Sequence, residues 1–253
     1  ATQVRVEKDL KQTTGRSRHD LGREAFLEKV WEWKEKHGGI IINQLHKLGC
    51  SCDWDRERFT MDEEYTKAVG QVFIELFKEG LIYRGRRMVN WCPVSLTALS
   101  DEEVIMTEQK SKLYTVLYKL EGGSGALHVA TTRPETIMAD VAVAVNPKDP
   151  RYAHLIGKNV MRPLNPTPIP IIGDEYVEIE FGTGALKITP AHDKADFEIG
   201  RKFNLEIIDI LTPDGHINCP EVPELHGMDR FDARRKSVEM LEASGLMVNI
   251  EDY

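Results

Sequence analysis

The chain contains little cysteine, and the cysteines that it has are not spaced for metal binding. Its 253 residues contain Cys50, Cys52, Cys92 and Cys219, and no two of them form a C-x-x-C pair. This spacing excludes a disulfide framework and a cysteine zinc site. We therefore expect reduced thiols.

Long apolar segments are also missing. No stretch approaches the roughly 20 consecutive apolar residues of a membrane-spanning helix, and residues 1–10 lack the apolar core of a secretory signal. A content of 41% hydrophobic and 29% charged residues excludes disorder, collagen and coiled coil. We expect a cytoplasmic, monomeric protein without a membrane partner. The start at Ala1 without methionine suggests a piece of a longer polypeptide, although methionine removal or a designed start gives the same sequence.

Charge, tryptophan and proline divide the chain near residue 92. Residues 1–92 carry 17 Lys/Arg against 15 Asp/Glu and contain all four tryptophans. Residues 93–253 carry 16 Lys/Arg against 26 Asp/Glu and contain all twelve prolines. We therefore predict a first domain of residues 1–92 and a second domain of residues 93–253.

The first part has the apolar periodicity of helices. One helical region is predicted between Asp20, a candidate N-cap, and Gly49. A capping box at residues 60–63 predicts the start of a further helix that Gly80 ends. With one short strand at residues 88–91, this part is predicted to be mostly helical.

The second part changes to the period of strands, separated by Gly and Pro turns. Its predicted strands are residues 113–120, 126–131, 141–145, 176–181 and 185–188. Two helices are predicted after them, at residues 194–203 with Asp193 as N-cap and at residues 230–243 before Gly245. The fold class is therefore α/β (α+β), with a closed or strongly curved β-structure and flanking helices.

Polar residues gather at the ends of two predicted strands, where binding groups are commonly found. Alternation along residues 185–189 places Lys187 and Thr189 on the same face. If this face points inward, an ammonium and a hydroxyl form a polar pocket wall. If it points outward, Lys187 is an ordinary solvated charge.

Acidic residues follow this strand at the start of a predicted helix. Capping explains Asp193 but leaves Asp196 free for a ligand. With His192, the two carboxylates could also form a zinc or manganese site. No second histidine follows at helical spacing and Lys187 would compete with the cation, so we predict no metal. His192 alone is either a general base or a structural residue.

The remaining candidates are glycines and a threonine-rich segment. Gly182-x-Gly184 precedes a strand rather than a helix, which favours close approach of a ligand to the backbone over a phosphate loop. The residues that could contact a phosphate or ribose are Thr131, Thr132, Arg133 and Thr136. The alternative is that these threonines are ordinary strand residues.

The two polar segments resemble the signatures of the editing insertion of valyl-tRNA synthetases, a class I aminoacyl-tRNA synthetase family. The first runs from Thr131-Thr-Arg-Pro-Glu-Thr136 to Asp140-Val-Ala-Val-Ala-Val145. The second reads Gly182-Thr-Gly-Ala-Leu-Lys-Ile-Thr-Pro-Ala-His-Asp, with Asp196 three residues later. The Lys-x-Thr pair distinguishes it from leucyl and isoleucyl members. Residues 1–92 resemble the catalytic-domain segment that leads into the insertion.

The resemblance implies a β-barrel-like editing domain, preceded by a mostly helical piece of a Rossmann-type catalytic domain. It implies proofreading of threonyl-tRNA(Val) by a positioned water, with the tRNA(Val) 3′ end carrying threonine as partner. The ATP-binding motifs and the anticodon-binding domain are not found, so we expect no aminoacylation. This piece is expected to need no cofactor, whereas the full-length ligase would use ATP with magnesium. The alternative is a module that docks the tRNA end without autonomous catalysis.

The resemblance also assigns roles to residues. Lys187 and Thr189 would read the threonyl hydroxyl, with Asp193 assisting, and Asp196 would hold the α-ammonium group. Arg133 and Thr136 would position the terminal adenosine or its phosphate. The full set of expected substrate-binding residues is Thr131, Thr132, Arg133, Thr136, Gly182, Gly184 and His192.

Overall fold

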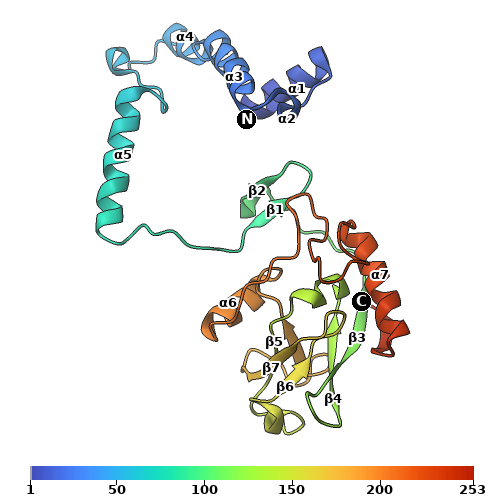
Figure 1. Ribbon diagram of the computed structural model, residues 1–253. Coiled ribbons are helices and arrows are strands. Elements are labelled where there is room, and N and C mark those ends of the chain that lie inside the picture. The colour runs from blue at the N-terminus through green and yellow to red at the C-terminus, as the bar shows by residue number, and fades with distance from the viewer. Residues whose placement is uncertain (1) are drawn as a thin grey trace. The chain divides into compact units, whose positions relative to one another are not determined.

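The computed structural model describes residues 2–253. The chain divides into two compact units, residues 1–84 and 85–253, which are blue to cyan and green to red in Figure 1. The predicted boundary at residue 92 coincides with the end of the first strand of the second unit, β1 (Asn90–Cys92). The assignment of residues 1–92 and 93–253 to two functional domains stays a prediction.

The first unit is helical, as its apolar periodicity predicts. Its α-helices are α1 (Thr2–Thr14), α2 (Arg18–Leu21), α3 (Arg23–His37), α4 (Ile40–Lys47) and α5 (Glu63–Lys78). A 3-10 turn, η1 (Trp54–Arg56), lies between α4 and α5.

Two of the predicted helix starts are wrong. Asp20 lies inside α2, where its carboxylate accepts a hydrogen bond from the backbone N–H of Ser17 at 2.8 Å. Thr60 does not cap α5, because the Asp62 carboxylate accepts from the backbone N–H of Tyr65 at 2.7 Å. Ser17 caps α2 instead, Gly22 precedes α3 without a side-chain cap, and Asp62 caps α5.

The hydrophobic core of the first unit is small. Its buried side chains are Val6, Leu10 and Phe26, on α1 and α3. The apolar stripe of α5 is instead exposed, at Val69, Val72, Phe73, Ile74 and Phe77. Helix α5 therefore gains little stability from tertiary packing within the unit.

The second unit contains three sheets. An antiparallel ribbon joins β1 to β2 (Thr97–Leu99). A three-stranded antiparallel sheet has the order β4 (Ala126–Thr131), β3 (Lys112–Lys119) and β9 (Met247–Asp252). A four-stranded mixed sheet has the order β6 (Asn159–Met161), β7 (Pro168–Gly173), β5 (Ala142–Val145) and β8 (Ala185–Ile188). The helices are α6 (Lys194–Lys202) and α7 (Arg230–Ala243), with 3-10 turns η2 (Asp101–Glu103), η3 (Pro134–Ala139) and η4 (Ala153–Leu155).

Most of the predicted elements of this unit are confirmed, and one strand is wrong. Residues 176–181 form turns rather than a strand. The Asp174 carboxylate accepts from the backbone N–H of Tyr176 at 3.0 Å, and the Phe181 N–H donates to the Glu178 carbonyl at 3.3 Å. These local hydrogen bonds replace the pairing that a strand would need.

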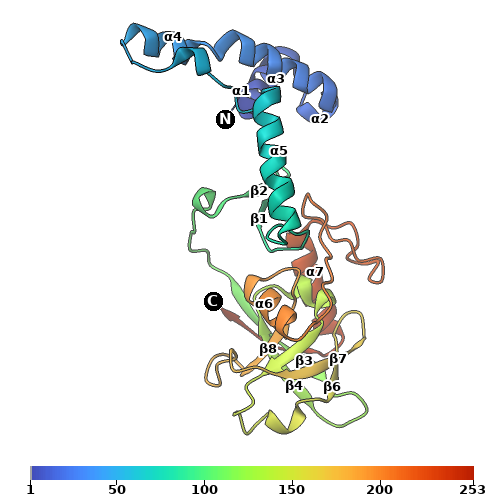
Figure 2. The ribbon, with the colours of Figure 1, turned by 90° about the vertical axis from the view of Figure 1, so that its left-hand side faces the viewer.

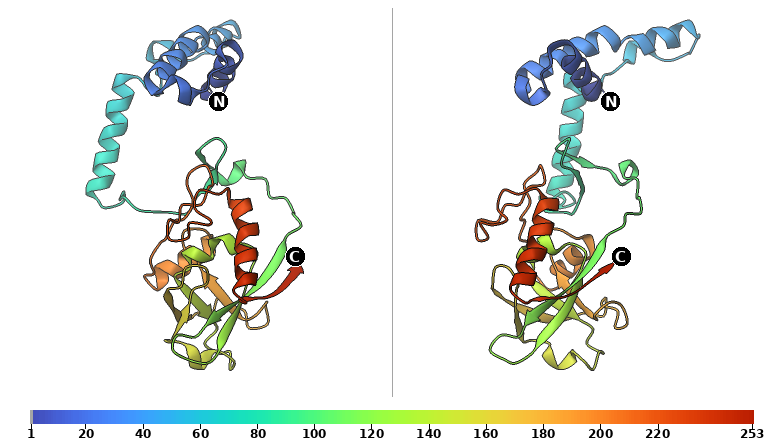
Figure 3. Two further views of the ribbon diagram at one scale, coloured as in Figure 1. Left: turned by 45° about the vertical axis from the view of Figure 1, so that its right-hand side comes forward. Right: turned by 90° about the vertical axis from the view of Figure 1, so that its right-hand side faces the viewer.

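Strand β5 lies at the centre of the second unit and is buried on both faces. Val143 and Val145 pack in one cluster with Val116 of β3 and Val129 of β4. The opposite face of β5 packs against Ile199 of α6, which covers this side of the sheet (Figure 2). Helix α7 lies beside β3 and leads into β9 (Figure 3).

The predicted mixed α/β class is confirmed, but the strands do not close into a barrel. Strands β4 and β8 contact each other, yet among residues 2–253 no ladder pairs them. The backbone link between the two sheets is a single isolated bridge of Leu120 with Val160, beside which the Glu121 N–H donates to the Asn159 carbonyl at 3.0 Å. Within the same residues, no helix has the length and apolarity that a bilayer crossing requires.

The unequal cores predict unequal protection from hydrogen exchange. We expect the amides of α5 to exchange much faster than those of β5, because α5 exposes its apolar stripe and β5 is buried on both faces. Exchange of the intact chain followed by mass spectrometry measures both segments together. Equal protection of residues 63–78 and 142–145 would contradict this.

Candidate active site

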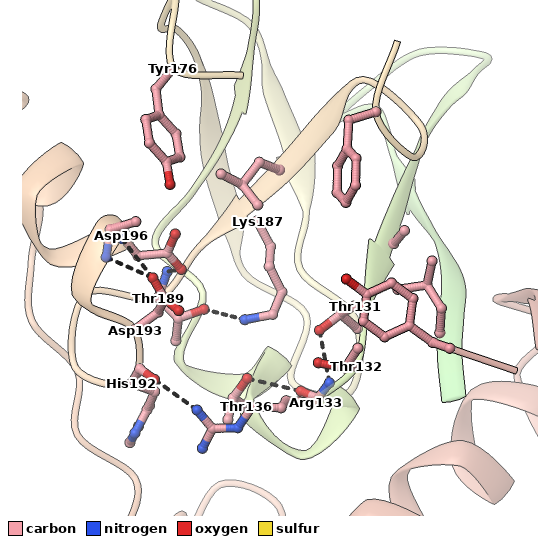
Figure 4. Close-up of a pocket in the computed structure, with 16 residues that line it drawn as sticks. Thr131, Thr132, Arg133, Thr136, Tyr176, Lys187, Thr189, His192, Asp193 and Asp196 are labelled. Atoms are coloured by element: carbon pink, nitrogen blue, oxygen red, sulfur yellow. Dashed lines mark hydrogen bonds between the residues drawn. The ribbon is translucent and has the colours of Figure 1, made fainter. Parts of the chain in front are cut away.

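A cavity of about 320 Å³ opens where β4 and β8 end (Figure 4). Residues from β4, η3, β8 and the start of α6 form its polar side, and aromatic side chains form part of its rim. Of the predicted site residues, the structure brings together Thr131, Thr132, Arg133, Thr136, Lys187, Thr189, His192, Asp193 and Asp196. We call this space the inner cavity.

Lys187 and Thr189 form a buried polar wall of the inner cavity. Their residues are only 8% and 0% exposed, so the face that carries them points inward, as the first of the two alternatives for the strand predicts. The Lys187 ammonium contacts the Thr189 hydroxyl directly. Both groups also donate to one carboxylate oxygen of Asp140, at 3.2 Å from Nζ and 2.6 Å from Oγ1.

Asp140 is the central acceptor of this wall, and its role was missed from the sequence. Its side chain is fully buried, and its second oxygen accepts from the Tyr118 hydroxyl at 2.5 Å. The Arg162 guanidinium donates to the Asp140 backbone carbonyl at 3.0 Å. Burial raises the pKa of Asp140, while Lys187 and the hydroxyl donors act in the opposite direction. The only local signal was an aspartate at the start of an apolar strand.

Asp196 presents a second carboxylate to the inner cavity. One oxygen accepts from the backbone N–H of Thr189 at 2.9 Å, which ties α6 to the end of β8. Burial raises the pKa of Asp196 to about 6. At neutral pH the group is therefore ionised, with one oxygen turned to a local N–H and the other available to a cation.

Asp193 has the capping role that its position predicts. A single oxygen of its carboxylate accepts from the backbone N–H groups of Ala195 and Asp196, at 2.8 and 3.1 Å. The residue is exposed at the mouth of the inner cavity. Its contact with a substrate stays a prediction.

His192 contributes its backbone to the site more than its ring. Its ring Nε2 accepts from the backbone N–H of Ile210 at 3.3 Å, and its carbonyl accepts from the Arg133 guanidinium at 2.7 Å. Burial lowers the pKa of His192 to about 4, so the ring is neutral at pH 7. A ring nitrogen already used by Ile210 is poorly placed to accept a proton from a reacting water.

The three side chains of the metal hypothesis point to different partners. His192 bonds Ile210, Asp193 caps α6 and Asp196 bonds Thr189. Throughout residues 2–253, no three His, Cys, Asp or Glu side chains are grouped closely enough to hold a metal ion.

The threonine-rich segment forms a tight loop around Arg133. The Thr131 hydroxyl accepts from the Arg133 backbone N–H at 3.1 Å, and the Thr136 hydroxyl donates to the Arg133 carbonyl at 2.9 Å. Glu135, only 1% exposed, lies 3.5 Å from the Arg133 Nε and accepts two hydrogen bonds from Arg234 of α7. These contacts hold Arg133 in a fixed orientation. Thr132 lines the inner cavity beside it.

The two predicted glycines lie outside the lining of the inner cavity. Gly182 has a φ of 57° and borders an adjoining hollow with Phe181. Gly184 has a φ of 74°, and a Cβ there would clash with the Arg151 guanidinium. Glycine at position 184 therefore leaves room for the Arg151 side chain.

Known sequences resemble this chain along its full length. Residues 1–233 match the family described as tRNA synthetases class I (I, L, M and V). A valine--tRNA ligase of Chlorobaculum tepidum is 54% identical over 254 residues, covering 100% of this chain and 28% of the relative. Those of Thermus thermophilus and Bacillus subtilis are 53% and 51% identical, and the chain spans 29% and 28% of their lengths.

Two solved structures show weaker similarity. The ternary complex of Agrobacterium radiobacter K84 agnB2 LeuRS-tRNA-LeuAMS gives a TM-score of 0.45 at 18% identity, covering 98% of this chain and 38% of that one. The structure GlLeuRS-CP1 gives 0.43 at 11% identity, covering 55% of this chain and 99% of that one.

The buried ion pair predicts a large cost for removing its acid. Asp140→Ala leaves the Lys187 ammonium in the wall without its ion-pair partner, and we expect the free energy of unfolding to fall by about 3–5 kcal/mol. Urea denaturation measures this change. The matched control is Asp174→Ala, because Asp174 is also buried but its partner Lys202 is 61% exposed and returns to water. Equal losses in both variants would refute a special role for Asp140.

The raised pKa of Asp196 predicts that its charge costs stability. In the folded state the Asp196 carboxyl keeps its proton up to about pH 6, whereas its ordinary pKa is 3.8. The wild type therefore loses stability as the pH rises from 3.8 to about 6. Asp196→Asn keeps the acceptor for Thr189 and carries no charge. We expect it to be more stable than the wild type at pH 8, by at most about 3 kcal/mol, and nearly equal to it at pH 3.

Thermal denaturation of both proteins across this pH range measures the difference. A stability gap that does not change with pH would contradict a raised pKa at Asp196.

Proposed function

Because the chain belongs to the tRNA synthetases class I (I, L, M and V), we propose that residues 93–253 form an editing domain that hydrolyses threonyl-tRNA(Val). The resemblance to valyl-tRNA synthetases is confirmed by the valine--tRNA ligases that match the whole chain. On this proposal the two open sheets of residues 93–253 form the framework of the editing domain, and residues 1–92 are part of a Rossmann-type catalytic domain. ATP with magnesium would serve only the full-length ligase.

The buried wall of Lys187, Thr189 and Asp140 is the observation that carries this proposal. A hydrophobic pocket cannot strongly reject an isostere that adds a hydroxyl, and threonine in a valine pocket is the standing example. A second, polar site is needed to tell them apart. Of the three N–H groups of the Lys187 ammonium, two are used by Asp140 and Thr189. The third is available to the threonyl hydroxyl.

Asp196 supports the proposal at the other end of the amino acid. An esterified threonine carries a free α-ammonium group, which a buried carboxylate binds through charge-assisted hydrogen bonds. The free oxygen of Asp196 provides such an acceptor, and the backbone bond to Thr189 keeps it beside the wall that reads the side chain. The hydrogen bond between Asp196 and Thr189 therefore fixes the distance between the carboxylate that binds the α-ammonium group and the wall that reads the side chain.

The mouth of the inner cavity supports binding of the tRNA end. Arg133, whose side chain is 39% exposed, offers a guanidinium to a phosphate. Tyr176, Phe181 and Tyr253 expose more than half of their surface near the inner cavity, which suits stacking with a base. The terminal adenosine would lie between these rings and Arg133.

The reaction is attack of a water on the ester carbonyl carbon. The bond to the ribose oxygen breaks, that oxygen takes up a proton, and free threonine and deacylated tRNA leave. With the ring nitrogen of His192 engaged by Ile210, the rate would come from orientation of the ester and stabilisation of the developing oxyanion.

The alternative proposal is a module that docks the tRNA end without catalysis. It is favoured by the fact that the chain spans about 28% of the length of its relatives, so other tRNA contacts lie elsewhere. Its net charge of −8 also gives no general attraction to nucleic acid.

Deacylation rates separate these proposals. We expect the chain to hydrolyse threonyl-tRNA(Val) faster than valyl-tRNA(Val), with no effect of a chelator. Asp196→Ala should lower the threonyl rate by about 10- to 100-fold, since it removes a charge-assisted bond. No hydrolysis of either ester would favour the docking module. Loss of activity with chelator would favour a metal site at His192, Asp193 and Asp196.

Discrimination should depend on the polar wall. Lys187→Met should lower the ratio of threonyl to valyl hydrolysis by about tenfold, because it removes the donor that reads the hydroxyl. The control is Lys148→Met, whose ammonium is exposed and pairs with Glu175 at 3.0 Å. The ratio of the two initial rates is the readout. An unchanged ratio in Lys187→Met would show that the wall does not determine specificity.

A further inference from the structure

A cavity of about 420 Å³ lies in the second unit between β3, the turn that joins β6 to β7, and the C-terminal end of α7, the helix beside β3 (Figure 3). We call it the α7 cavity. It shares no lining residue with the inner cavity, and the proposed deacylation uses none of its residues. Two cationic side chains, Arg162 and Lys119, interrupt a mostly apolar lining. The apolar side chains include Leu117, Met161, Leu164, Met240 and Leu246.

Arg162 is a buried cation whose hydrogen bonds all go to neutral oxygens. The residue is only 8% exposed. Its guanidinium donates to the Asp140 backbone carbonyl at 3.0 Å and to the Thr167 hydroxyl at 3.1 Å, and its Nε donates to the Asn165 carbonyl at 3.5 Å. A guanidinium carries five N–H groups. Two of them therefore have no acceptor within residues 2–253.

The charge of Arg162 is not balanced by an acid. Across residues 2–253, no carboxylate makes an ion pair with it, and the carboxylate of Asp140 is paired with Lys187 at 3.2 Å. Burial lowers the pKa of Arg162, and the opposing effects of Asp140 and the exposed Glu206 are smaller. One buried acid thus serves two buried cations. Because a buried charge without a counter-charge is unfavourable, the surroundings of Arg162 favour an anion.

Lys119 adds a second positive charge to the α7 cavity. It is an exposed residue of β3, and among the described residues no acid lies within ion-pair distance of its ammonium. The part of the lining that the structure describes contains no carboxylate. The electrostatic character of the α7 cavity is therefore positive throughout.

We propose that the α7 cavity binds a small aliphatic carboxylate. The carboxylate accepts charge-assisted hydrogen bonds from the N–H groups of Arg162 that have no other acceptor, and Lys119 attracts it from the rim. The hydrocarbon body lies against Leu117, Leu164 and Leu246, where it leaves water. This inference goes beyond the proposed function and does not depend on it.

An α-amino acid fits this cavity less well than the corresponding acid without an amino group. Its ammonium would be repelled by Lys119 and would find no carboxylate in the described lining. The carbonyls at the end of α7 are also engaged, because those of Met240, Leu241 and Glu242 accept backbone N–H groups of residues 244–246. The ligand class is therefore an aliphatic acid that carries no ammonium group.

The test compares four probes on the intact chain at pH 7. The first is 4-methylpentanoate. The others are 4-methylpentan-1-ol, which lacks the charge, acetate, which lacks the apolar body, and leucine, which adds an ammonium. NMR titration of the Met161 and Met240 methyl signals gives the affinity of each probe and its place of binding. We expect 4-methylpentanoate to bind at least about tenfold more tightly than each of the other three.

Variants assign the binding to the α7 cavity. Arg162→Gln should weaken 4-methylpentanoate at least about tenfold, and Lys119→Met about threefold, because an exposed charge is screened by water. Ser244→Trp fills the cavity from the exposed end of α7 and should abolish binding. Lys158→Met, at an exposed lysine of the same unit outside this lining, is the matched control and should bind like the wild type. If Arg162→Gln does not fold, Ser244→Trp and Lys119→Met still decide the matter.

Three results would overturn the site. The first is that the alcohol binds as tightly as the acid, or that no probe shifts the two methyl signals. The second is that leucine binds as tightly as 4-methylpentanoate, which would reject the ligand class. The third is that binding of the acid survives Ser244→Trp. None of these results depends on whether the chain hydrolyses threonyl-tRNA(Val).

Discussion

The buried carboxylate of Asp140 is the charge on which the rest of the site depends. An unpaired buried charge is very unfavourable, so the fold must surround it with donors. The donors come from separate strands, with Tyr118 on β3 and Lys187 on β8. They meet only when the two sheets pack face to face around β5. The polar wall is therefore a product of the hydrophobic core, and the same packing that buries Val143 brings Lys187 to its partner.

The local pattern of the sequence predicted the parts of this site that depend on one strand or one helix. Alternation placed Lys187 and Thr189 on one face, and helix-start chemistry placed Asp193 as the cap of α6. The partners of Asp140 lie 22 and 47 residues away along the chain. No periodicity encodes such a contact, because it is set by how sheets pack. The turn at residues 176–181 was missed for a local reason. Its alternation is typical of a strand, but the Asp174 carboxylate accepts a hydrogen bond from the Tyr176 N–H and favours a turn.

Arg133 shows how a loop residue acquires a fixed direction. The threonine-rich motif suggested a phosphate contact, which the motif alone cannot orient. In the structure Glu135 is buried between Arg133 and Arg234, so one carboxylate restrains two guanidinium groups, one from the residue before η3 and one from α7. The His192 carbonyl adds a third restraint. A guanidinium held in this way loses less entropy on binding a phosphate than a free surface arginine would.

If the chain has the proposed editing function, the mutual bonding of the wall limits how strongly it can discriminate threonine from valine. Lys187 and Thr189 are already satisfied by Asp140, so a valyl side chain that enters does not leave all of them unpaired. Only the third N–H group of Lys187 would lose its hydrogen bond to water without gaining a new partner. A single lost hydrogen bond to a charged donor corresponds to about 1.5–3 kcal/mol, or a factor of roughly ten to one hundred. A larger preference would require a further acceptor for the threonyl hydroxyl, and the exposed carboxylate of Asp193 at the mouth of the inner cavity is one candidate, because only one of its oxygens is used to cap α6.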